Sequence, residues 1–290
     1  MHLVRYQLPG QRPQAGVLSG DTVAPVAGVA GMAELLRLTA DELRTAVGKT
    51  GDEVAVADVK LLPPLDGFGE VWCAGVTYER SRDARVEESA AQDVYTLVYE
   101  AERPELFLKD AGCRRTVGPG EPIGVRSDSS WNVPEPELGL VLGRDGAVAG
   151  VTIGNDVSSR EIEGANPLYL PQAKVYAGAC ALGPAVLSPV PAGPFELQLR
   201  ILAASGQELF AGETSTARMK RTFADLVAFL LRENPVPAGS VLLTGTGLVP
   251  PDDFTLEPGH VVEIEVPGIG ILANPVVLAS RIVERSLAHV

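Results

Sequence analysis

Alternating apolar and polar positions are the clearest pattern in this chain, and they predict β-strands. Apolar residues alternate with charged or amide residues over 195–201 and again over 262–266, which is the period of a strand with one buried face. Two dipeptides, Ser205-Gly206 and Asp145-Gly146, are typical of the tight turns in hairpins. Together with short apolar runs, these signals predict strands at 71–76, 138–143, 148–153, 195–201, 241–243 and 262–266.

Helical spacing is restricted to a few segments. Apolar residues at 223, 226, 227, 230 and 231 follow the i, i+3, i+4, i+7, i+8 pattern of one helix face. Thr222 is the expected N-cap of this helix, and Asn234-Pro235 is its expected end. Spacing alone therefore favours a mainly-β domain with few helices over alternating β/α units.

The first 65 residues are expected to form a separate small domain. A strand over 3–8 is followed by helical spacing over 32–38 and 41–47. Within the second helix, Thr39 and Glu42 match a capping box and Gly48 is the expected stop. The apolar, proline-stiffened stretch 61–65 closes the unit, so we expect an N-terminal domain at 1–65 and a second domain at 66–290.

Composition and charge exclude several classes of function. The net charge of −13 has the wrong sign for a nucleic-acid-binding protein. No apolar run reaches the ~18 residues that a membrane span needs. The N-terminus lacks an apolar signal region, and the three cysteines match neither a disulfide framework nor a zinc site. We therefore expect a cytoplasmic protein without a nucleic-acid or membrane partner.

The candidate chemistry centres on carboxylates. Proline fixes its own backbone and extends the residue before it, so the sequence Val-Pro-Glu-Pro-Glu-Leu at 133–138 is stiff and extended. Alternate residues of a strand face one side, so Glu135 and Glu137 project together. The turn at Asp145-Gly146 sends the chain back, and Asp156 follows at a distance that can return it beside them. Buried like charges need a countercharge, which a divalent cation supplies.

Three carboxylates with open water positions suit Mg²⁺ or Mn²⁺, and Ca²⁺ is compatible. No histidine lies between His2 and His260, which removes the commonest general base and the commonest zinc ligand from that span. The alternative is a proline-rich acidic loop with solvated side chains, because two glutamates one residue apart are a weak motif. Spacing alone leaves both interpretations open.

A longer, ordered set of motifs resembles the fumarylacetoacetate hydrolase family. The likeness covers roughly residues 70 to 275, and its specificity comes from the order of the pieces. The pieces are Glu135-Pro-Glu-Leu, Gly154-Asn-Asp-Val-Ser-Ser-Arg, Lys174, Leu182-Gly-Pro, Thr244-Gly-Thr-Gly and Pro267-Gly-Ile-Gly.

Within that family the chain is most similar to dehydratases of 2-keto-3-deoxy pentonates derived from arabinonate or xylonate, through the stretches 78–83, 103–107 and 166–174. The resemblance implies an α+β, mainly β fold with a mixed β-roll catalytic domain behind a small N-terminal α/β domain. It also implies Mg²⁺ held by Glu135, Glu137 and Asp156. A small-molecule 2-keto acid substrate and a homodimer or homotetramer are further implications.

Two departures from the hydrolases of this family bear on the reaction. The hydrolases typically carry a histidine where Ser81 stands, and that histidine activates water for C–C bond hydrolysis. They also commonly carry glutamine where Glu163 stands. The resemblance therefore favours dehydration to 2,5-dioxopentanoate. A diketo-acid hydrolase or an oxaloacetate decarboxylase is the alternative, and a non-enzymatic sugar-acid-binding module is a third hypothesis.

The implied dehydration gives roles to two ionisable side chains. Mg²⁺ would chelate the substrate carboxylate and 2-keto oxygen and stabilise the enolate that forms when a C3 proton leaves. We expect Lys174 to take that proton with a lowered pKa; the alternative is a structural salt bridge to the carboxylates. We expect Glu105 to protonate the leaving 4-hydroxyl with a pKa raised by burial; the alternative is a surface pair with Arg103.

Three more residues are candidate substrate contacts. Tyr78 would hydrogen-bond the substrate or form a wall of the core. Lys109 would hold a substrate oxygen or a carboxylate of the site. Thr246 lies in a glycine-rich turn whose backbone N–H groups can approach an anion, and the alternative is an ordinary β-turn.

Arg82 is the last candidate contact, for the substrate carboxylate or a hydroxyl. The alternative is a solvated helix over 79–89 laced with ion pairs. We expect the solvated interpretation to hold for Arg80 and Arg85 more than for Arg82.

Overall fold

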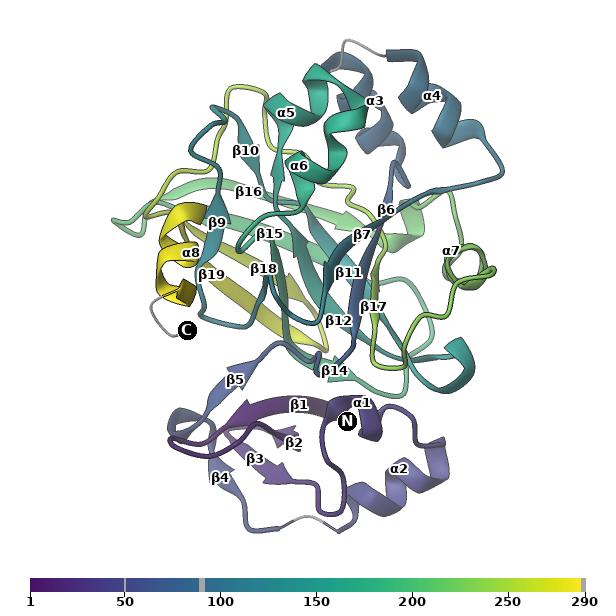
Figure 1. The fold of residues 1–290 in the computed structure, drawn as a ribbon, viewed down its shortest axis with the longest axis vertical. Helices are drawn as coiled ribbons and strands as arrows, with labels where there is room; N and C mark the ends of the chain where they lie inside the picture. The colour runs from purple at the N-terminus through teal and green to yellow at the C-terminus, as the bar shows by residue number, and fades with distance from the viewer. Residues whose placement is uncertain (50, 89–91, 288–290) are drawn as a thin grey trace.

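The structure, a computed structural model, describes residues 1–49, 51–88 and 92–287, and two sheets with flanking helices dominate it (Figure 1). The strands of the large sheet are β1 (His2–Gln7), β2 (Gln14–Ser19), β3 (Thr22–Pro25), β4 (Val54–Ala55), β5 (Lys60–Leu62), β6 (Glu70–Gly75), β7 (Glu105–Ala111), β8 (Thr116–Val117), β11 (Pro136–Leu142), β12 (Val148–Asp156), β14 (Cys180–Leu187) and β17 (Val241–Leu243). They run in the order β4-β3-β2-β1-β14-β12-β11-β17-β6-β7, with β5 beside β1 and β8 beside β14.

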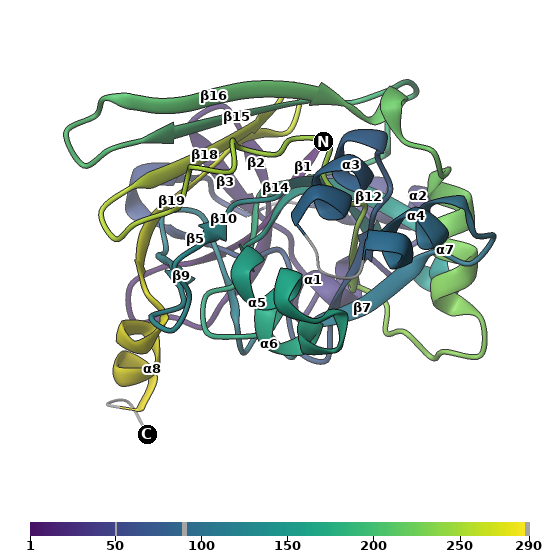
Figure 2. The same cartoon turned by 90° about the horizontal axis from the view of Figure 1, so that it is seen from above.

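The second sheet has the order β16-β15-β18-β19-β9 and forms a separate layer across the large sheet (Figure 2). Its strands are β9 (Ile123–Val125), β15 (Glu196–Leu202), β16 (Glu208–Ser215), β18 (Val261–Val266) and β19 (Gly270–Leu278). A two-stranded piece pairs β10 (Asn132–Val133) with β13 (Ser158–Ser159). The main core lies between the two layers, where Leu138 and Ile153 cluster with Leu199 and Ile264.

The helices gather mainly at one end of the molecule. In Figure 1, α3 to α6 cover the end of the large sheet that lies opposite the N-terminal elements. The helices are α1 (Met32–Leu35), α2 (Ala40–Val47), α3 (Glu79–Glu88), α4 (Gln92–Glu100), α5 (Arg160–Ala165), α6 (Leu170–Lys174), α7 (Phe223–Leu231) and α8 (Ala279–Leu287), with 3-10 turns η1 (Val56–Asp58), η2 (Arg144–Gly146), η3 (Pro167–Tyr169) and η4 (Thr216–Arg218). Within the described ranges, none of these helices is long and apolar enough to cross a membrane.

The predicted strands and hairpins are confirmed. Burial alternates along β15 and β18, as the sequence pattern requires. The hairpin between β11 and β12 turns at Asp145, whose φ is 57°. β15 and β16 are antiparallel neighbours on either side of Ser205-Gly206. The predicted α7 begins after Thr222, whose side chain accepts a hydrogen bond from the N–H of Asp225.

The N-terminal segment forms the predicted strand and helices and joins the large sheet directly. Thr39 and Glu42 make the predicted capping box on α2. Antiparallel pairing of β1 with β14 then makes the N-terminal strands continuous with the rest of the sheet. The division between residues 65 and 66 stays a prediction.

Most of the helices around the site were not predicted from spacing. α4, α5 and α6 are short, and polar residues interrupt their apolar ones. The spacing of apolar residues therefore gives little indication of these helices. α3 was foreseen only as a solvated helix over 79–89, and residue 89 lies outside the described residues. The α+β, mainly β class is nevertheless confirmed by the element order.

Candidate metal and active site

Three buried carboxylates converge at one end of the β11–β12 hairpin. Glu135, Glu137 and Asp156 each offer an oxygen, and these oxygens lie within 4.8 Å of one another. The three residues are 4%, 1% and 1% exposed, which excludes the solvated acidic loop. The structure therefore brings together the three residues that the sequence predicted as metal ligands.

Strand pairing explains this convergence. Glu137 lies opposite Gly154 in the β11–β12 ladder, so the end of β12 returns beside the start of β11. The N–H of Asp156 donates to the carbonyl of Glu135 at 3.0 Å. The side chain of Asn155 accepts from the N–H of Glu135 at 3.1 Å. The backbone of all three carboxylate residues is thus held by hydrogen bonds within the protein.

Two buried lysines contact the carboxylates. The Nζ of Lys174, at the end of α6, lies 2.9 Å from Oδ2 of Asp156 and 2.9 Å from Oε1 of Glu135. Lys109 in β7 donates to the carbonyl of Val157 at 3.0 Å and forms an ion pair with the other oxygen of Asp156. Burial opposes ionisation of Asp156, but the two lysines outweigh it and lower its pKa.

The expectation of a lowered pKa for Lys174 is corrected. Burial favours the neutral amine, but Asp156 and Glu135 outweigh it and raise the pKa of Lys174 well above its ordinary value. The lysine therefore forms the salt bridge that was the alternative interpretation. Lys109 likewise holds a carboxylate of the site.

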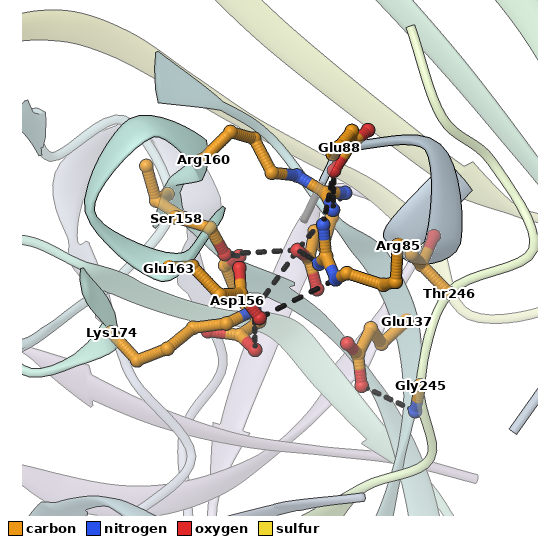
Figure 3. A network of polar contacts seen from close by, with 12 residues as sticks. Arg85, Glu88, Glu137, Asp156, Ser158, Arg160, Glu163, Lys174, Gly245 and Thr246 are labelled. Carbon is orange, nitrogen blue, oxygen red and sulfur yellow. Dashed lines mark hydrogen bonds and ion pairs between the residues drawn. The ribbon is translucent and has the colours of Figure 1, made fainter. Parts of the chain in front are cut away.

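A second ionic layer surrounds Glu135, and Figure 3 labels three of its members, Arg85, Glu88 and Arg160. Arg85 contacts Glu135 at 2.7 Å and Glu88 at 2.9 Å. Arg160 contacts the same two carboxylates at 3.3 Å and 3.0 Å. The expectation that Arg85 lies on a solvated face is wrong: it is 5% exposed, because that face of α3 packs onto α5 rather than meeting water.

Glu137 differs from its two neighbours in having no lysine or arginine partner among the ion pairs of the described residues. Its Oε2 accepts a hydrogen bond from the N–H of Gly245 at 2.6 Å, as Figure 3 shows. Burial, together with the charges of Asp156 and Glu135, raises the pKa of Glu137 well above its ordinary value. A carboxylate in this position is suited to a cation that the protein itself does not supply.

The chemistry of the donor set leads to the same conclusion. Glu135, Glu137 and Asp156 present oxygen donors only, and all three are buried. Hard divalent cations such as Mg²⁺ prefer oxygen ligands. The residues present therefore fit a hard divalent ion with oxygen ligands.

A narrow cavity adjoins the carboxylates. It has room for the centre of about one water molecule, ≈ 10 Å³, so substrate entry requires its walls to move. Glu105 and Lys174 both line it, as do Ser81, Thr246 and Glu163. Besides these, its walls include Ala74, Gly75, Val76, Arg85, Phe107, Glu135, Asp156 and Gly245.

Glu105 lies in the cavity wall for a local reason. It pairs with Gly75 across β6 and β7, and a Cβ at Gly75 would lie 2.0 Å from its Oε2. Burial first, and the charge of Glu163 second, raise the pKa of Glu105 to about 7. Arg103, the alternative surface partner, instead lies 5.6 Å from the ring of Phe229. The expected rise in pKa is confirmed.

Of the remaining predicted substrate contacts, Thr246 lines the cavity and Tyr78 and Arg82 do not. Thr246 reaches the cavity, but its hydroxyl donates to the carbonyl of Leu248 at 3.1 Å. Tyr78 is 3% exposed, its ring packs against Gly247, and it is not among the residues that line the cavity. Arg82 pairs with Asp83 at 2.6 Å and lies 4.9 Å from the ring of Tyr99, so the structure does not bring it to the carboxylates.

Sequence reasoning missed the outer ionic layer. Arg160 stood in the family motif that also contains Asp156, but no role was assigned to it. Glu163 stood out only as a departure from glutamine. Glu88 gave no signal, because a glutamate on a charged helix has the pattern of a surface residue.

Comparisons with known proteins cover almost the whole chain. A sequence model described as fumarylacetoacetate (FAA) hydrolase, C-terminal, matches residues 70–277, and one described as Rv2993c-like, N-terminal, matches residues 1–64. The chain is 47% identical over 252 residues to a "Probable 2-keto-3-deoxyxylonate dehydratase" of Haloferax volcanii, covering 86% of each chain. It is 43% identical over 227 residues to a "2-dehydro-3-deoxy-D-arabinonate dehydratase" of Saccharolobus solfataricus, covering 76% of each.

Solved structures add a match of the whole fold. One is described as 2-keto-3-deoxy-D-arabinonate dehydratase complexed with magnesium and 2,5-dioxopentanoate. It superposes with a TM-score of 0.82 at 34% identity, covering 95% of this chain and 98% of that chain. The predicted mixed β-roll architecture is thereby confirmed.

Proposed function

The chain belongs to the fumarylacetoacetate (FAA) hydrolase family, and we propose that it is a Mg²⁺-dependent dehydratase of a 2-keto-3-deoxy pentonate derived from arabinonate or xylonate. The products are 2,5-dioxopentanoate and water. The observation that carries the proposal is the convergence of three buried carboxylates beside Lys174 and Glu105. The identity of 47% and 43% to dehydratases of this substrate class supports the choice of reaction.

Glu135, Glu137 and Asp156 are the proposed ligands of Mg²⁺, and the same oxygens are compatible with Mn²⁺ or Ca²⁺. Bound there, Mg²⁺ supplies a Lewis acid for the carboxylate and 2-keto oxygens of the substrate and neutralises the charge of its ligands. Lys109 holds Asp156 in place from the side opposite Lys174.

Lys174 is the proposed base at C3. Its amine is held by two of the ligands and lines the cavity, so it faces a substrate bound at the carboxylates. A divalent cation held by Asp156 and Glu135 would offset the charges that raise the pKa of Lys174, and would so make the free amine available. Lys174 then removes the C3 proton, and the electron pair of the C–H bond forms the C3–C4 double bond.

Glu105 is the proposed acid at C4. With a pKa of about 7 it is substantially protonated at neutral pH, as a proton donor must be. As the C4–O bond breaks, the hydroxyl takes the Glu105 proton and leaves as water. Two proton shifts then complete the product: one proton moves from C5 to C3, and the proton of the C5 hydroxyl moves to C4, which leaves the aldehyde at C5. Thr246 is the proposed contact of the substrate carboxylate. Tyr78 and Arg82, the other two proposed contacts, are not among the residues that line the cavity.

The same-family alternatives, diketo-acid hydrolysis and oxaloacetate decarboxylation, have less support. Ser81 lines the cavity and is 5% exposed. A buried serine at that point leaves the cavity without the histidine that would activate water in the hydrolases.

A homodimer or homotetramer in the cytoplasm completes the proposal. The assembly is supported by the family resemblance. The location is supported by the free thiols of Cys73, Cys113 and Cys180, which suit a reducing compartment.

Product analysis tests the function. Purified protein, Mg²⁺ and 2-keto-3-deoxy-arabinonate should yield an aldehyde that an aldehyde dehydrogenase oxidises, with no pyruvate released. Pyruvate release from an acylpyruvate at a faster rate than the dehydration would instead favour the hydrolase. Absence of both products would contradict an enzyme of either kind.

A further inference from the structure

Glu163 presents an unsatisfied acceptor to the cavity. This residue of α5 is 5% exposed and belongs to the cavity wall. Its Oε1 lies 3.4 Å from Nε of Arg85, which is the single ion pair that it makes among the described residues. Its Oε2 is buried and has no hydrogen-bond partner. Figure 3 shows the side chain beside Asp156 and Lys174.

A buried carboxylate oxygen without a donor is costly, because it has lost its hydration and gained nothing in return. Such an oxygen in a cavity wall is suited to a ligand that brings an O–H or N–H group. Lys174 and Glu105 also line the cavity, and both already have roles in the proposed reaction. Glu163 is left as an acceptor without an assigned donor.

The substrate has one donor group left to place. Under the proposed function, its carboxylate and 2-keto oxygens would face the cation that Glu135, Glu137 and Asp156 would hold, and its 4-hydroxyl leaves with the Glu105 proton. The hydroxyl on C5 is therefore the group without a partner. Resting on the proposed function, we infer that Glu163 accepts a hydrogen bond from the C5 hydroxyl and selects 2-keto-3-deoxy acids that carry one.

This assignment has a physical consequence for specificity. A site built around a buried polar group discriminates strongly against a ligand that cannot satisfy that group. An analogue in which C5 is a methyl group, without the hydroxyl, would leave Oε2 of Glu163 unpaired. A hydrogen bond to a charged acceptor corresponds to roughly a 10- to 100-fold preference for the hydroxylated substrate.

The chain offers a matched control in Glu88. It contacts both Arg85 and Arg160 and also has a buried oxygen, Oε1, without a partner. Glu88 is absent from the cavity wall. A change at Glu88 disturbs the same ionic layer without removing an acceptor from the cavity.

The experiment compares kcat/KM for 2-keto-3-deoxy-arabinonate and for 4-hydroxy-2-oxopentanoate, which keeps the leaving hydroxyl but has a methyl group at C5. Wild type, Glu163→Ala and Glu88→Ala are assayed with Mg²⁺, with circular dichroism and thermal melting as checks of folding. Glu163→Gln, which keeps the side-chain volume and a weaker neutral acceptor, is the second variant in case Glu163→Ala does not fold.

Wild type should prefer the hydroxylated substrate by roughly 10- to 100-fold, and Glu163→Ala should lose that preference mainly by slowing the hydroxylated substrate. Glu163→Gln should give an intermediate ratio, and Glu88→Ala should keep the wild-type ratio. Equal loss on both substrates in the Glu163 variants would overturn the inference while leaving the dehydratase function intact. A wild type that dehydrates neither compound would overturn the function and this inference together.

Discussion

The amine of Lys174 lies 2.9 Å from Oδ2 of Asp156, which ties the end of α6 to the end of β12. Because the same amine also contacts Glu135, one side chain holds two of the three converging carboxylates at a fixed separation. The contact has two consequences. It keeps the carboxylates together, and it holds the amine at the wall of the cavity, where we propose that C3 of a bound 2-keto acid lies.

Replacing Lys174 should slow the reaction strongly. Lys174→Met removes the proposed base, and general-base catalysis contributes about 10²- to 10⁴-fold, so kcat should fall by that factor. Aldehyde formation from 2-keto-3-deoxy-arabinonate measures it. Lys174→Arg is the matched control, because arginine keeps the positive charge but cannot accept a proton. It should be comparably inactive yet melt near the wild-type temperature, and tenfold or less loss in Lys174→Met would remove the lysine from the mechanism.

Glu137→Gln should separate metal binding from stability. Glu137 is a buried carboxylate without a cationic partner, so its charge weakens the metal-free protein while serving the metal. The variant should bind Mg²⁺ at least about 100-fold more weakly by calorimetry. In the presence of a chelator its melting temperature should equal or exceed that of the wild type.

Asp156→Asn is the contrasting variant. Its carboxylate contacts both Lys109 and Lys174, so removing the charge leaves two buried cations underpaired. The metal-free variant should melt well below the wild type. If Glu137→Gln and Asp156→Asn lowered the chelated melting temperature equally, the asymmetry described for the three carboxylates would be wrong.

The sequence was sufficient for the parts of this protein that follow from local rules. The two prolines around Glu135, the turn at Asp145 and the alternation along β15 act through backbone geometry and burial, and each predicted its element correctly. The three ligands could be proposed because Glu137 and Asp156 lie on two strands joined by one hairpin, and Glu135 immediately precedes the first of these strands.

The outer ionic layer could not be predicted in the same way. Arg85 and Glu88 lie on a helix with an almost uniformly charged sequence, so no apolar stripe shows which face is buried. Their burial is decided by contact with Glu135 and Arg160, which lie far along the chain. The direction of the Lys174 pKa also depended on distances to two carboxylates that spacing does not give.

The pH profile should report Glu105. Its pKa of about 7 means that the protonated acid declines above neutrality. The alkaline limb of kcat/KM in the wild type should therefore fall with an apparent pKa near 7. Glu105→Gln should have a low rate and should lose that limb. An unchanged alkaline limb in the variant would assign it to another group.

The stability of the protein should also depend on the protonation of Glu105, and it should decrease as the pH rises. The pKa of Glu105 is raised on folding from 4.5 to about 7, so the folded state holds a proton that the unfolded state releases. The contribution of Glu105 to the free energy of unfolding is complete below pH 4.5, and it is lost as the pH rises to about 7. The melting temperature of Glu105→Gln should consequently fall less than that of the wild type between pH 5 and pH 8.

Gly245→Ala should damage the site through the backbone. Gly245 has a φ of +90°, and an added Cβ would lie 2.0 Å from Oγ1 of Thr77 and 2.9 Å from the carbonyl of Ala74. The loop must shift, which withdraws the N–H donor from Glu137. Both the free energy of unfolding and the affinity for Mg²⁺ should fall.

Gly268→Ala is its control. Gly268 has a similar φ of +87°, but the nearest atom to an added Cβ, on Leu187, lies 4.0 Å away. Backbone strain alone should lower the free energy of unfolding of Gly268→Ala by about 1–3 kcal/mol, as measured by denaturant unfolding. The affinity for Mg²⁺ should stay unchanged. Equal effects of the two variants on Mg²⁺ binding would separate Gly245 from the metal site.

The position of a bound cation is the sharpest test of the proposed metal site. Crystals grown with Mn²⁺ and measured at the manganese absorption edge would locate the ion by its anomalous signal. We expect one strong peak bonded to Glu135, Glu137 and Asp156, at the oxygen distances of a hard divalent ion. A peak bound elsewhere, or none at these carboxylates while turnover requires the metal, would contradict it.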